Sequence, residues 1–244
     1  MQSFIDWLVF EFDRTFIRDG RWQTFAEGLR NTLVITVIAA LLGIAIGTFV
    51  AIVHRFATDP GVTRRKNLGT ALLKVVDKIL SAYVAVMRGT PLAIQLMIVA
   101  FIVLAGPRYS SVMKCCIAFG INSGAYVSEV IRGGLGSVDK GQMEAGRSLG
   151  MNWIDCMRLI VLPQAMASIL PALCNEGIAV LKETSIVGLI SVTDLTRASD
   201  KVRSRTMSPY FPLISVAIVY FILVAGLSAL VGRLEKRLSQ GRSA

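Results

Sequence analysis

The sequence predicts an all-α integral membrane protein, a helical bundle with five transmembrane helices. Hydrophobic residues make up 54% of the 244 positions and charged residues only 17%, whereas a soluble domain is about 45–50% apolar and about 25% charged. Three uncharged stretches are each long enough to cross a hydrocarbon layer about 30 Å thick as a helix; they cover residues 31–53, 89–107 and 206–232. This composition excludes a disordered chain, a fibrous repeat and a typical soluble enzyme.

Two further spans are predicted from stretches that contain few charges. Residues 110–131 are apolar apart from Lys114 and Glu129 near the two ends, and residues 159–181 are apolar apart from Glu176. The second span begins before Arg88, and Pro91 is expected to start a new helical turn within it. The five predicted spans are residues 31–53, 80–105, 110–131, 164–181 and 209–232.

Small residues recur at four-residue spacing in two of these spans. Gly43 and Gly47 lie in the first span, and Gly120 and Gly124 lie in the third. This spacing fits a close approach between helices, and it fits ordinary helix glycines equally well.

The basic charge of the chain indicates membrane orientation rather than nucleic-acid binding. In a soluble protein a net charge of +10 would suggest a nucleic-acid partner, but in an apolar chain it indicates Lys and Arg beside the spans. Lys and Arg number 14 on one side of the predicted bundle and 11 on the other. This bias favours an outer N-terminus and an inner C-terminus, although a basic loop over residues 182–205 works against it. No nucleic-acid partner is expected.

The spans divide the chain into three parts. Residues 1–28 combine mixed charges with several aromatic side chains and are expected to form an amphipathic segment at the membrane interface. Residues 29–237 form the transmembrane domain, which includes a long cytoplasmic loop over residues 132–163. Residues 238–244 form a cytoplasmic tail.

The side-chain inventory argues against a metal site and against nucleotide binding by this chain. The four cysteines form no Cys-x-x-Cys pair and His54 is the single histidine, so neither metal nor cofactor is expected. Cys115 and Cys116 are expected to pack as small apolar residues. A Gly-x-x-x-x-Gly-Lys-Ser/Thr phosphate loop is absent from the sequence.

The loop over residues 132–163 is long for a connection within a bundle, and it has its own helical signals. Residues 142–149 favour a helix, Gly150 breaks it, and Asn152 can cap a second helix at 153–160. The second helix carries an apolar stripe at three- and four-residue spacing, formed by Trp153, Ile154, Met157, Ile160 and Val161. Such a stripe can lie along the membrane or dock in the groove of a partner.

Residues in this loop also resemble a known signature. Glu144-Ala145-Gly146, then Gly150, then Ile160-Val161-Leu162-Pro163 is similar to the loop of ATP-binding-cassette importer permeases, whose pattern is Glu-Ala-Ala, three residues, Gly, nine residues, Ile-x-Leu-Pro. Gly146 departs from the pattern, and because Gly is a poorer helix former than Ala by about 1 kcal/mol, the first helix is expected to be looser.

Further stretches resemble the branch of that family that imports polar amino acids of the histidine, glutamate, glutamine, arginine and opine type. The likeness covers residues 28–237, and Gly124 stands where the family usually has Ala. The matching stretches are Arg88-Gly89-Thr90-Pro91, Asn122-Ser123-Gly124-Ala125-Tyr126, Glu129-Val130-Ile131-Arg132-Gly133-Gly134 and Lys182-Glu183-Thr184-Ser185.

The resemblance implies a passive permease of the bacterial inner membrane with the type I importer fold. It implies three protein partners: a cytoplasmic ATP-binding subunit dimer that binds and hydrolyses ATP, a second permease of the same or a different chain, and an extracytoplasmic amino-acid-binding protein. The lipid bilayer surrounds the spans. The residues expected to couple the chain to the ATPase are Glu144, Ala145, Gly150, Trp153, Ile160 and Pro163.

Glu176 is the main candidate for the substrate pathway. A carboxylate within a span costs about 2.5–3.5 kcal/mol on insertion scales and is a functional candidate by default. It either faces the pathway and meets an ammonium or cationic side chain, or it caps or pairs within the dimer, for example with Arg88 or Lys182. Polar neighbours that could contact substrate, or could instead join helices together, are Asn175, Asn122, Ser123 and Thr90.

Two other functions remain alternatives. An integral-membrane enzyme would need a nucleophile, a metal cluster or paired carboxylates near an interface, and Glu144 and Asp155 have no histidine beside them. A secondary transporter without an ATPase fits poorly, because the sequence has no evident inverted repeat.

Overall fold

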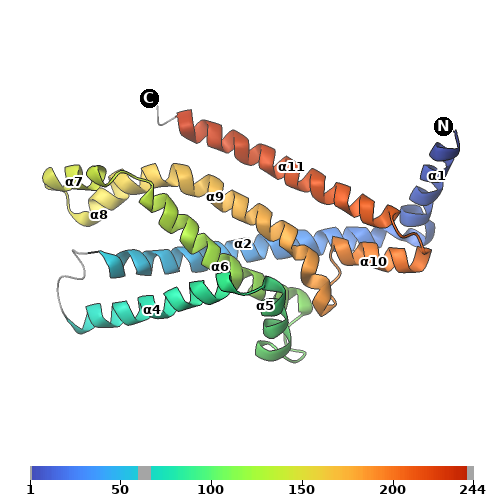
Figure 1. The fold of residues 1–244 in the computed structure, drawn as a ribbon, viewed down its shortest axis with the longest axis horizontal. Helices are drawn as coiled ribbons and strands as arrows, with labels where there is room; N and C mark the ends of the chain where they lie inside the picture. The colour runs from blue at the N-terminus through green and yellow to red at the C-terminus, as the bar shows by residue number, and fades with distance from the viewer. Residues whose placement is uncertain (1, 60–66, 241–244) are drawn as a thin grey trace.

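The computed structural model describes residues 2–59 and 67–240, and within them the chain is helical with no strand (Figure 1). The α-helices are α1 (Gln2–Phe12), α2 (Trp22–Thr58), α4 (Leu68–Gly89), α5 (Leu92–Ile98), α6 (Ser111–Gly136), α7 (Lys140–Ser148), α8 (Trp153–Cys156), α9 (Leu162–Glu183), α10 (Leu195–Thr206) and α11 (Phe211–Gln240). Shorter π and 3-10 segments are η1 (Asp13–Ile17), η2 (Arg18–Gly20), η3 (Val99–Val103), η4 (Met157–Val161) and η5 (Thr184–Ile190). The expected all-α class is confirmed.

Within the described residues, three continuous helices are long and apolar enough to cross a membrane: Trp22–Thr58, Trp153–Ile190 and Phe211–Leu238. A bent pair, Leu68–Gly89 with Leu92–Val103, gives a fourth candidate span. The predicted third span is present as α6, with 26 residues, but it is not among these apolar helices. Many α6 side chains are buried against other helices, and a helix covered by protein does not need a lipid-compatible surface. The count of five spans is therefore not confirmed as such.

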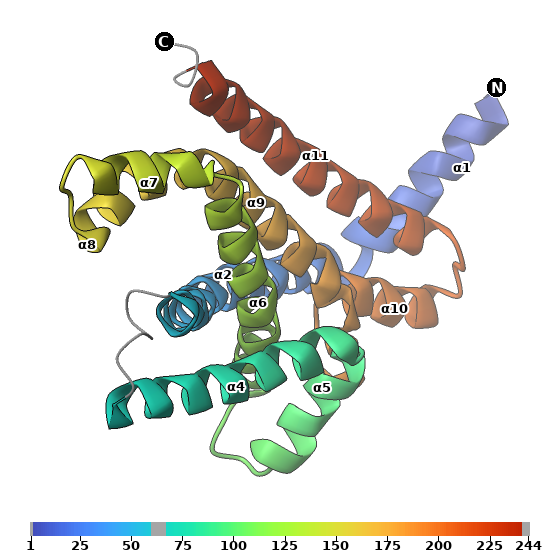
Figure 2. The same cartoon turned by 60° about the vertical axis from the view of Figure 1, so that its left-hand side comes forward.

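The second predicted span, residues 80–105, is wrong as a single helix. The helix starts earlier, at Leu68, and the chain bends by 114° between α4 and α5 (Figure 2). The break lies at Thr90 and Pro91, which both have extended backbone. Pro91 has no N–H to donate and forces the preceding residue out of the helical region, so the apolar run cannot continue straight.

The two short helices predicted in the long loop are present. The first is α7, and Gly150 then adopts a left-handed conformation with φ +85°. The Asn152 side chain accepts a hydrogen bond from the Asp155 backbone N–H and caps α8. However, α8 continues through η4 directly into α9, so the predicted helix at 153–160 and the predicted span at 164–181 form one element. We call residues 140–161 the elbow.

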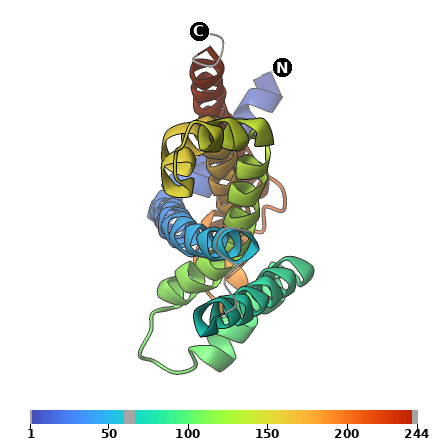
Figure 3. The same ribbon diagram turned by 90° about the vertical axis from the view of Figure 1, so that its left-hand side faces the viewer.

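The helix ends form two groups at opposite ends of the molecule. The elbow, the C-terminal end of α2 and the C-terminal end of α11 lie at one end, and α1 and α10 lie at the other (Figure 1). Figure 3 looks along the molecule from the elbow end. Which of these ends faces the cytoplasm stays a prediction. Some of the Lys and Arg residues counted for that prediction fall in 60–66 and 241–244, which lie outside the described residues. The end of the predicted tail over residues 238–244 lies outside them as well.

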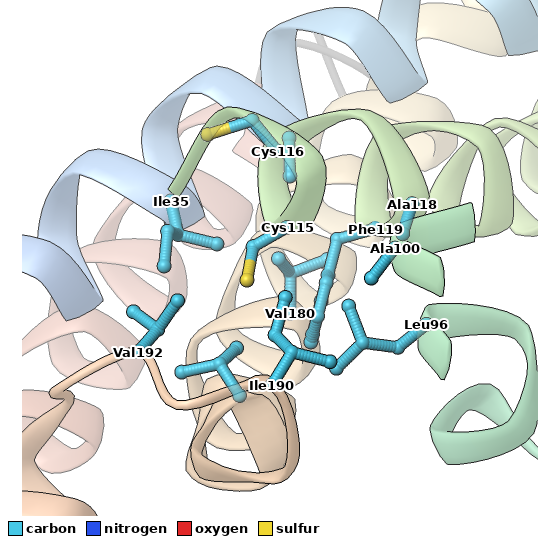
Figure 4. Packing of buried hydrophobic residues seen from close by; sticks show 12 residues of the cluster. Ile35, Leu96, Ala100, Cys115, Cys116, Ala118, Phe119, Val180, Ile190 and Val192 are labelled. Carbon is cyan, nitrogen blue, oxygen red and sulfur yellow. The ribbon is translucent and has the colours of Figure 1, made fainter. Parts of the chain in front are cut away.

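A buried apolar cluster at the crossing of five segments holds the bundle together (Figure 4). Cys115, Cys116 and Phe119 of α6 meet Ile35 of α2 and Val180 of α9, and each is at most 3% exposed. The expectation that the paired cysteines pack as small apolar residues is confirmed. Between membrane-spanning helices such side chains stabilise the bundle by close van der Waals packing.

The glycines of α2 and α6 allow these two helices to approach closely. A Cβ added at Gly43 would lie 2.7 Å from the Ser123 Oγ, and one added at Gly124 would lie 2.7 Å from the Ile46 Cγ2. Real Cβ atoms do not come so near, so the backbones need glycine at these positions. Of the two readings of the glycine spacing, close helix packing is confirmed.

The N-terminal helix packs on the start of α11. Ser208 Oγ donates a hydrogen bond to Glu11 Oε2 at 2.6 Å, and the Trp7 and Phe211 rings meet edge to face at 6.2 Å. Phe4 and Phe10 are at least half exposed. An interfacial position for this segment remains a prediction.

Candidate functional site

Glu176 lies inside the bundle and has a hydroxyl partner on a neighbouring helix. Ser123 Oγ of α6 donates a hydrogen bond to Glu176 Oε1 of α9 at 3.0 Å. Ser123 is 1% exposed, and it packs against Gly43 of α2. A carboxylate that has one neutral hydroxyl as its partner keeps acceptor capacity for another donor. The structure therefore brings two predicted pathway residues together.

Within this chain Arg88 does not contact Glu176, and pairing of Glu176 across a dimer stays a prediction. Arg88 Nη1 instead contacts Glu129 Oε2 at 3.1 Å. Asn175, the neighbour of Glu176 in the chain, is exposed. It therefore lies on the outside of the protomer and is not part of the Ser123–Glu176 contact.

Asn122 and Thr90 take part in a different network, which stabilises the bend between α4 and α5. Gln95 Nε2 donates to the Thr90 Oγ1 at 2.7 Å and to the Met87 carbonyl at 2.9 Å. Asn122 Nδ2 donates to Gln95 Oε1 at 2.8 Å. These bonds satisfy carbonyls that the break at Pro91 leaves without helical partners. Of the two roles considered for Asn122, its contacts favour the joining of helices.

Gln95 is a central residue of this network that the sequence analysis missed. It is 8% exposed, and it contacts both sides of the bend. A single amide within an apolar run, just after a Thr-Pro break, is the signal that could have identified it.

A cluster of charges lies nearer the elbow, between α2, α4 and α6. Arg132 Nη2 contacts Glu129 Oε2 at 2.6 Å, so Glu129 bridges Arg88 and Arg132. The expected local pair of Glu129 and Arg132 is confirmed. His54 Nδ1 of α2 contacts Asp77 Oδ1 of α4 at 2.8 Å, a pairing between helices that the sequence did not predict.

The elbow is a packed unit, and Gly146 is essential to its packing. Gly146 is buried, and a Cβ at this position would lie 2.8 Å from both the Cys156 Sγ and the Ile160 Cδ1. The departure of Gly146 from the family pattern therefore has a steric reason in this chain. Met157 and Val161 face inward, in a cluster with Val138, Ala165 and Ile169.

The elbow is also attached to the end of α2. The Trp153 ring lies against Phe56 with centroids 5.3 Å apart, and the Arg55 guanidinium lies over the Trp153 ring at 5.5 Å. Such aromatic contacts are worth about 0.5–1.5 kcal/mol beyond burial. These contacts join the elbow to the end of α2, which packs closely against α6 through its glycines.

The outer surface of the elbow is largely exposed. Glu144, Ala145 and Pro163 are exposed. Leu149 is 84% exposed and Ile154 64%. The predicted apolar stripe is thus divided: Met157 and Val161 face the bundle, and Ile154 faces outward. Exposed apolar side chains of this size next to polar ones are typical of a protein contact.

Comparisons with known proteins agree with this geometry. Residues 68–240 match the family described as binding-protein-dependent transport system inner membrane component. The putative glutamine transport system permease protein GlnP of Rickettsia bellii (strain RML369-C) is 38% identical over 214 residues, which cover 87% of this chain and 91% of the relative. The arginine transport system permease protein ArtQ of Bacillus subtilis (strain 168) is 35% identical over the same shares.

A solved structure shows the same fold. The crystal structure of an amino acid ABC transporter with histidines superimposes with a TM-score of 0.77 and 37% sequence identity, covering 88% of this chain and 94% of that chain. The residues matched by the family model, 68–240, run from α4 to α11. The chain accordingly belongs to the family of binding-protein-dependent transport system inner membrane components.

Proposed function

We propose that this chain is the permease subunit of an ATP-driven importer for polar amino acids. Relatives with 35–38% identity are named as glutamine and arginine transport permeases, and the solved structure at 37% identity is titled an amino acid ABC transporter. The observation that carries the proposal is the carboxylate of Glu176 inside the bundle, with Ser123 as its partner at 3.0 Å.

In this proposal Glu176 contacts the moving solute. An amino acid carries an ammonium group, and a carboxylate in a low-dielectric site attracts it much more strongly than in water. Ser123 holds the carboxylate toward α6 and supplies a hydroxyl that can accept or donate. Asn175 faces the second permease from the exposed side of α9, whereas Thr90 and Asn122 act through the bend that shapes the pathway.

A separate ATP-binding subunit supplies the energy. The exposed outer surface of the elbow, with Glu144, Leu149 and Ile154, is the docking surface for that subunit. Closure of the ATP-bound dimer displaces the elbow, and the Trp153–Phe56 contact passes this movement to α2, so that the bundle alternates between two openings. Gly150, Ile160 and Pro163 keep the elbow in shape.

The remaining partners follow from the same proposal. A second permease, identical or different, covers the other side of the pathway, and an extracytoplasmic amino-acid-binding protein delivers the solute at the α10 end. The elbow and the C-terminus face the cytoplasm, and the N-terminus faces outward.

The test is uptake by the assembled complex in liposomes, with a panel of labelled amino acids and with ATP inside. We expect ATP-dependent uptake of polar amino acids, and we expect Glu176→Gln to reduce it about tenfold or more, the size of effect of losing one charge-assisted hydrogen bond. Glu176→Asp keeps the charge and should retain part of the activity.

Glu235→Gln, on the exposed end of α11, is the matched control. Normal uptake with unchanged substrate preference in Glu176→Gln removes Glu176 from the pathway, and uptake without the ATP-binding subunit contradicts the proposal as a whole.

A further inference from the structure

A cavity of about 340 Å³ lies between α2, α4 and α6, on the elbow side of Glu176. Its polar lining consists of His54, Asp77, Ser81, Arg88, Glu129 and Arg132 together with Ser128. Along α6, Glu129 is six residues beyond Ser123, a rise of about 9 Å. The cavity is therefore distinct from the Ser123–Glu176 contact and lies farther along the bundle.

One part of the cavity wall carries excess positive charge. Arg88 and Arg132 both contact the same carboxylate oxygen of Glu129, at 3.1 and 2.6 Å. Two guanidinium groups against one carboxylate leave one positive charge uncompensated. Arg132 Nε also donates to Glu129 Oε1 at 3.0 Å, so the Nε and Nη2 edge of Arg132 is occupied by Glu129. The Arg88 and Arg132 side chains are 44% and 57% exposed, which leaves Nη1 of Arg132 and Nε and Nη2 of Arg88 as donors for a further ligand. A guanidinium fork binds a further carboxylate in bidentate geometry.

Another part of the wall carries a carboxylate that no arginine or lysine of the described residues contacts. Asp77 lies 2.8 Å from His54 Nδ1 and its side chain is 18% exposed. With this one contact the Asp77 carboxylate keeps acceptor capacity for a further donor. The cavity thus has an anion-binding wall on α4 and α6 and a cation-binding wall where α2 meets α4.

We infer that this cavity is a second amino-acid site, which binds the zwitterion with its α-carboxylate at Arg88 and Arg132 and its ammonium toward Asp77, and through which the amino acid on the elbow side slows uptake. The inference rests on the proposed function, because it takes the transported solute as the ligand. The cavity volume falls within the range of about 300–1,000 Å³ for small-molecule sites. Because the lining carries both positive and negative side chains, the cavity favours a zwitterion over a simple anion or cation.

A second cavity adjoins the first on the elbow side. It has a volume of about 400 Å³ and shares Ala51, His54 and Arg132 with the first cavity. Its lining adds Arg55 and Lys140. A solute on the elbow side therefore reaches Arg132 past cationic side chains, which attract its carboxylate. Occupation from this side holds α2, α4 and α6 together and opposes the next cycle, because a ligand favours the state to which it binds more tightly.

The test measures ATP-dependent uptake by the complete complex in liposomes, with increasing unlabelled L-glutamine in the lumen, or L-arginine if arginine is the solute taken up. The quantity compared is the lumenal concentration that halves the initial rate. We expect Arg132→Gln and Asp77→Asn to raise this concentration about tenfold or more, as one charge-assisted hydrogen bond predicts. Arg132→Lys, which keeps the charge but loses the fork, should give a smaller rise. Arg233→Gln, an exposed arginine of α11, is the control and should leave the concentration unchanged.

A second measurement does not depend on turnover. Equilibrium dialysis of the same complex with labelled L-glutamine or L-arginine should show binding that remains in Glu176→Gln and is lost in Glu176→Gln/Arg132→Gln. Equal inhibition of wild type and of both cavity variants overturns the inference, as does inhibition that follows the content of anionic lipid rather than the lumenal amino acid. Absence of any uptake by the wild-type complex is a different result, which contradicts the proposed function itself.

Discussion

The Trp153 indole on the elbow packs against Phe56 at the end of α2, with ring centroids 5.3 Å apart. The two residues are far apart in the chain, and their contact joins the surface proposed for the ATPase to a helix that lines the bundle. The elbow is therefore not an isolated loop, because its position determines that of α2.

We expect Trp153→Ala to reduce uptake severalfold while the complex still assembles in the membrane. The change removes the contact with Phe56 and the cation–π contact with Arg55, worth together about 1–2 kcal/mol. Uptake and ATP hydrolysis should be measured in the same liposomes, where the ratio of transport to hydrolysis falls. Trp153→Phe should recover part of the ratio of transport to hydrolysis. In a double-mutant cycle with Phe56→Ala, additive effects would show that the two rings do not act as a pair.

Gly150→Val is expected to uncouple ATP hydrolysis from transport. Gly150 has φ +85°, and a β-branched residue there costs about 1–3 kcal/mol in backbone strain. The turn between α7 and α8 must then change shape, although the spans are unaffected and the chain still inserts. Gly150→Asn tolerates a positive φ better and serves as the control. Unchanged transport by the Val variant would show that the turn is not a rigid part of the coupling.

Gly146→Ala should destabilise the elbow even though Ala is the better helix former. The new Cβ lies 2.8 Å from the Cys156 Sγ and the Ile160 Cδ1, and overpacking of this kind costs about 1–3 kcal/mol. Cys156→Ala with Ile160→Val removes these two atoms. The triple variant should therefore be more stable than Gly146→Ala alone, as measured by thermal unfolding of the purified complex. A Gly146→Ala protein with raised stability would mean that helix propensity outweighs the steric contact.

Gln95→Leu should loosen the bend between α4 and α5. The substitution removes the donor to Met87 and Thr90 and leaves Asn122 without its 2.8 Å acceptor. A buried polar group left without a partner costs about 1–3 kcal/mol. Thermal stability and hydrogen exchange of residues 86–96 report the change. Gln95→Glu keeps an acceptor for Asn122 but loses the donors to Met87 and Thr90. Wild-type stability and exchange in both Gln95→Leu and Gln95→Glu would show that Gln95 does not hold the bend.

The sequence predicts features that depend on neighbouring residues and misses features that depend on distant ones. Gly150 and Asn152 are local signals for a turn and a cap, and the elbow follows from them. Thr90 and Pro91 mark a break, but hydropathy counts only apolar length, so the 114° bend was not expected. The partner of Glu176 could not be predicted, because Ser123 is 53 residues away. The His54–Asp77 pair depends equally on how α2 packs against α4.

The near-contact of backbones at Gly43 and Gly124 has a mechanical consequence. Helices that meet without intervening side chains cannot slide or rotate past each other without collision, so α2 and α6 behave as a single stiff plate. Together they carry Ser123, Glu129 and the attachment of the elbow. In the proposed transport cycle, gating therefore falls to the elements around that plate, such as the break at Thr90–Pro91.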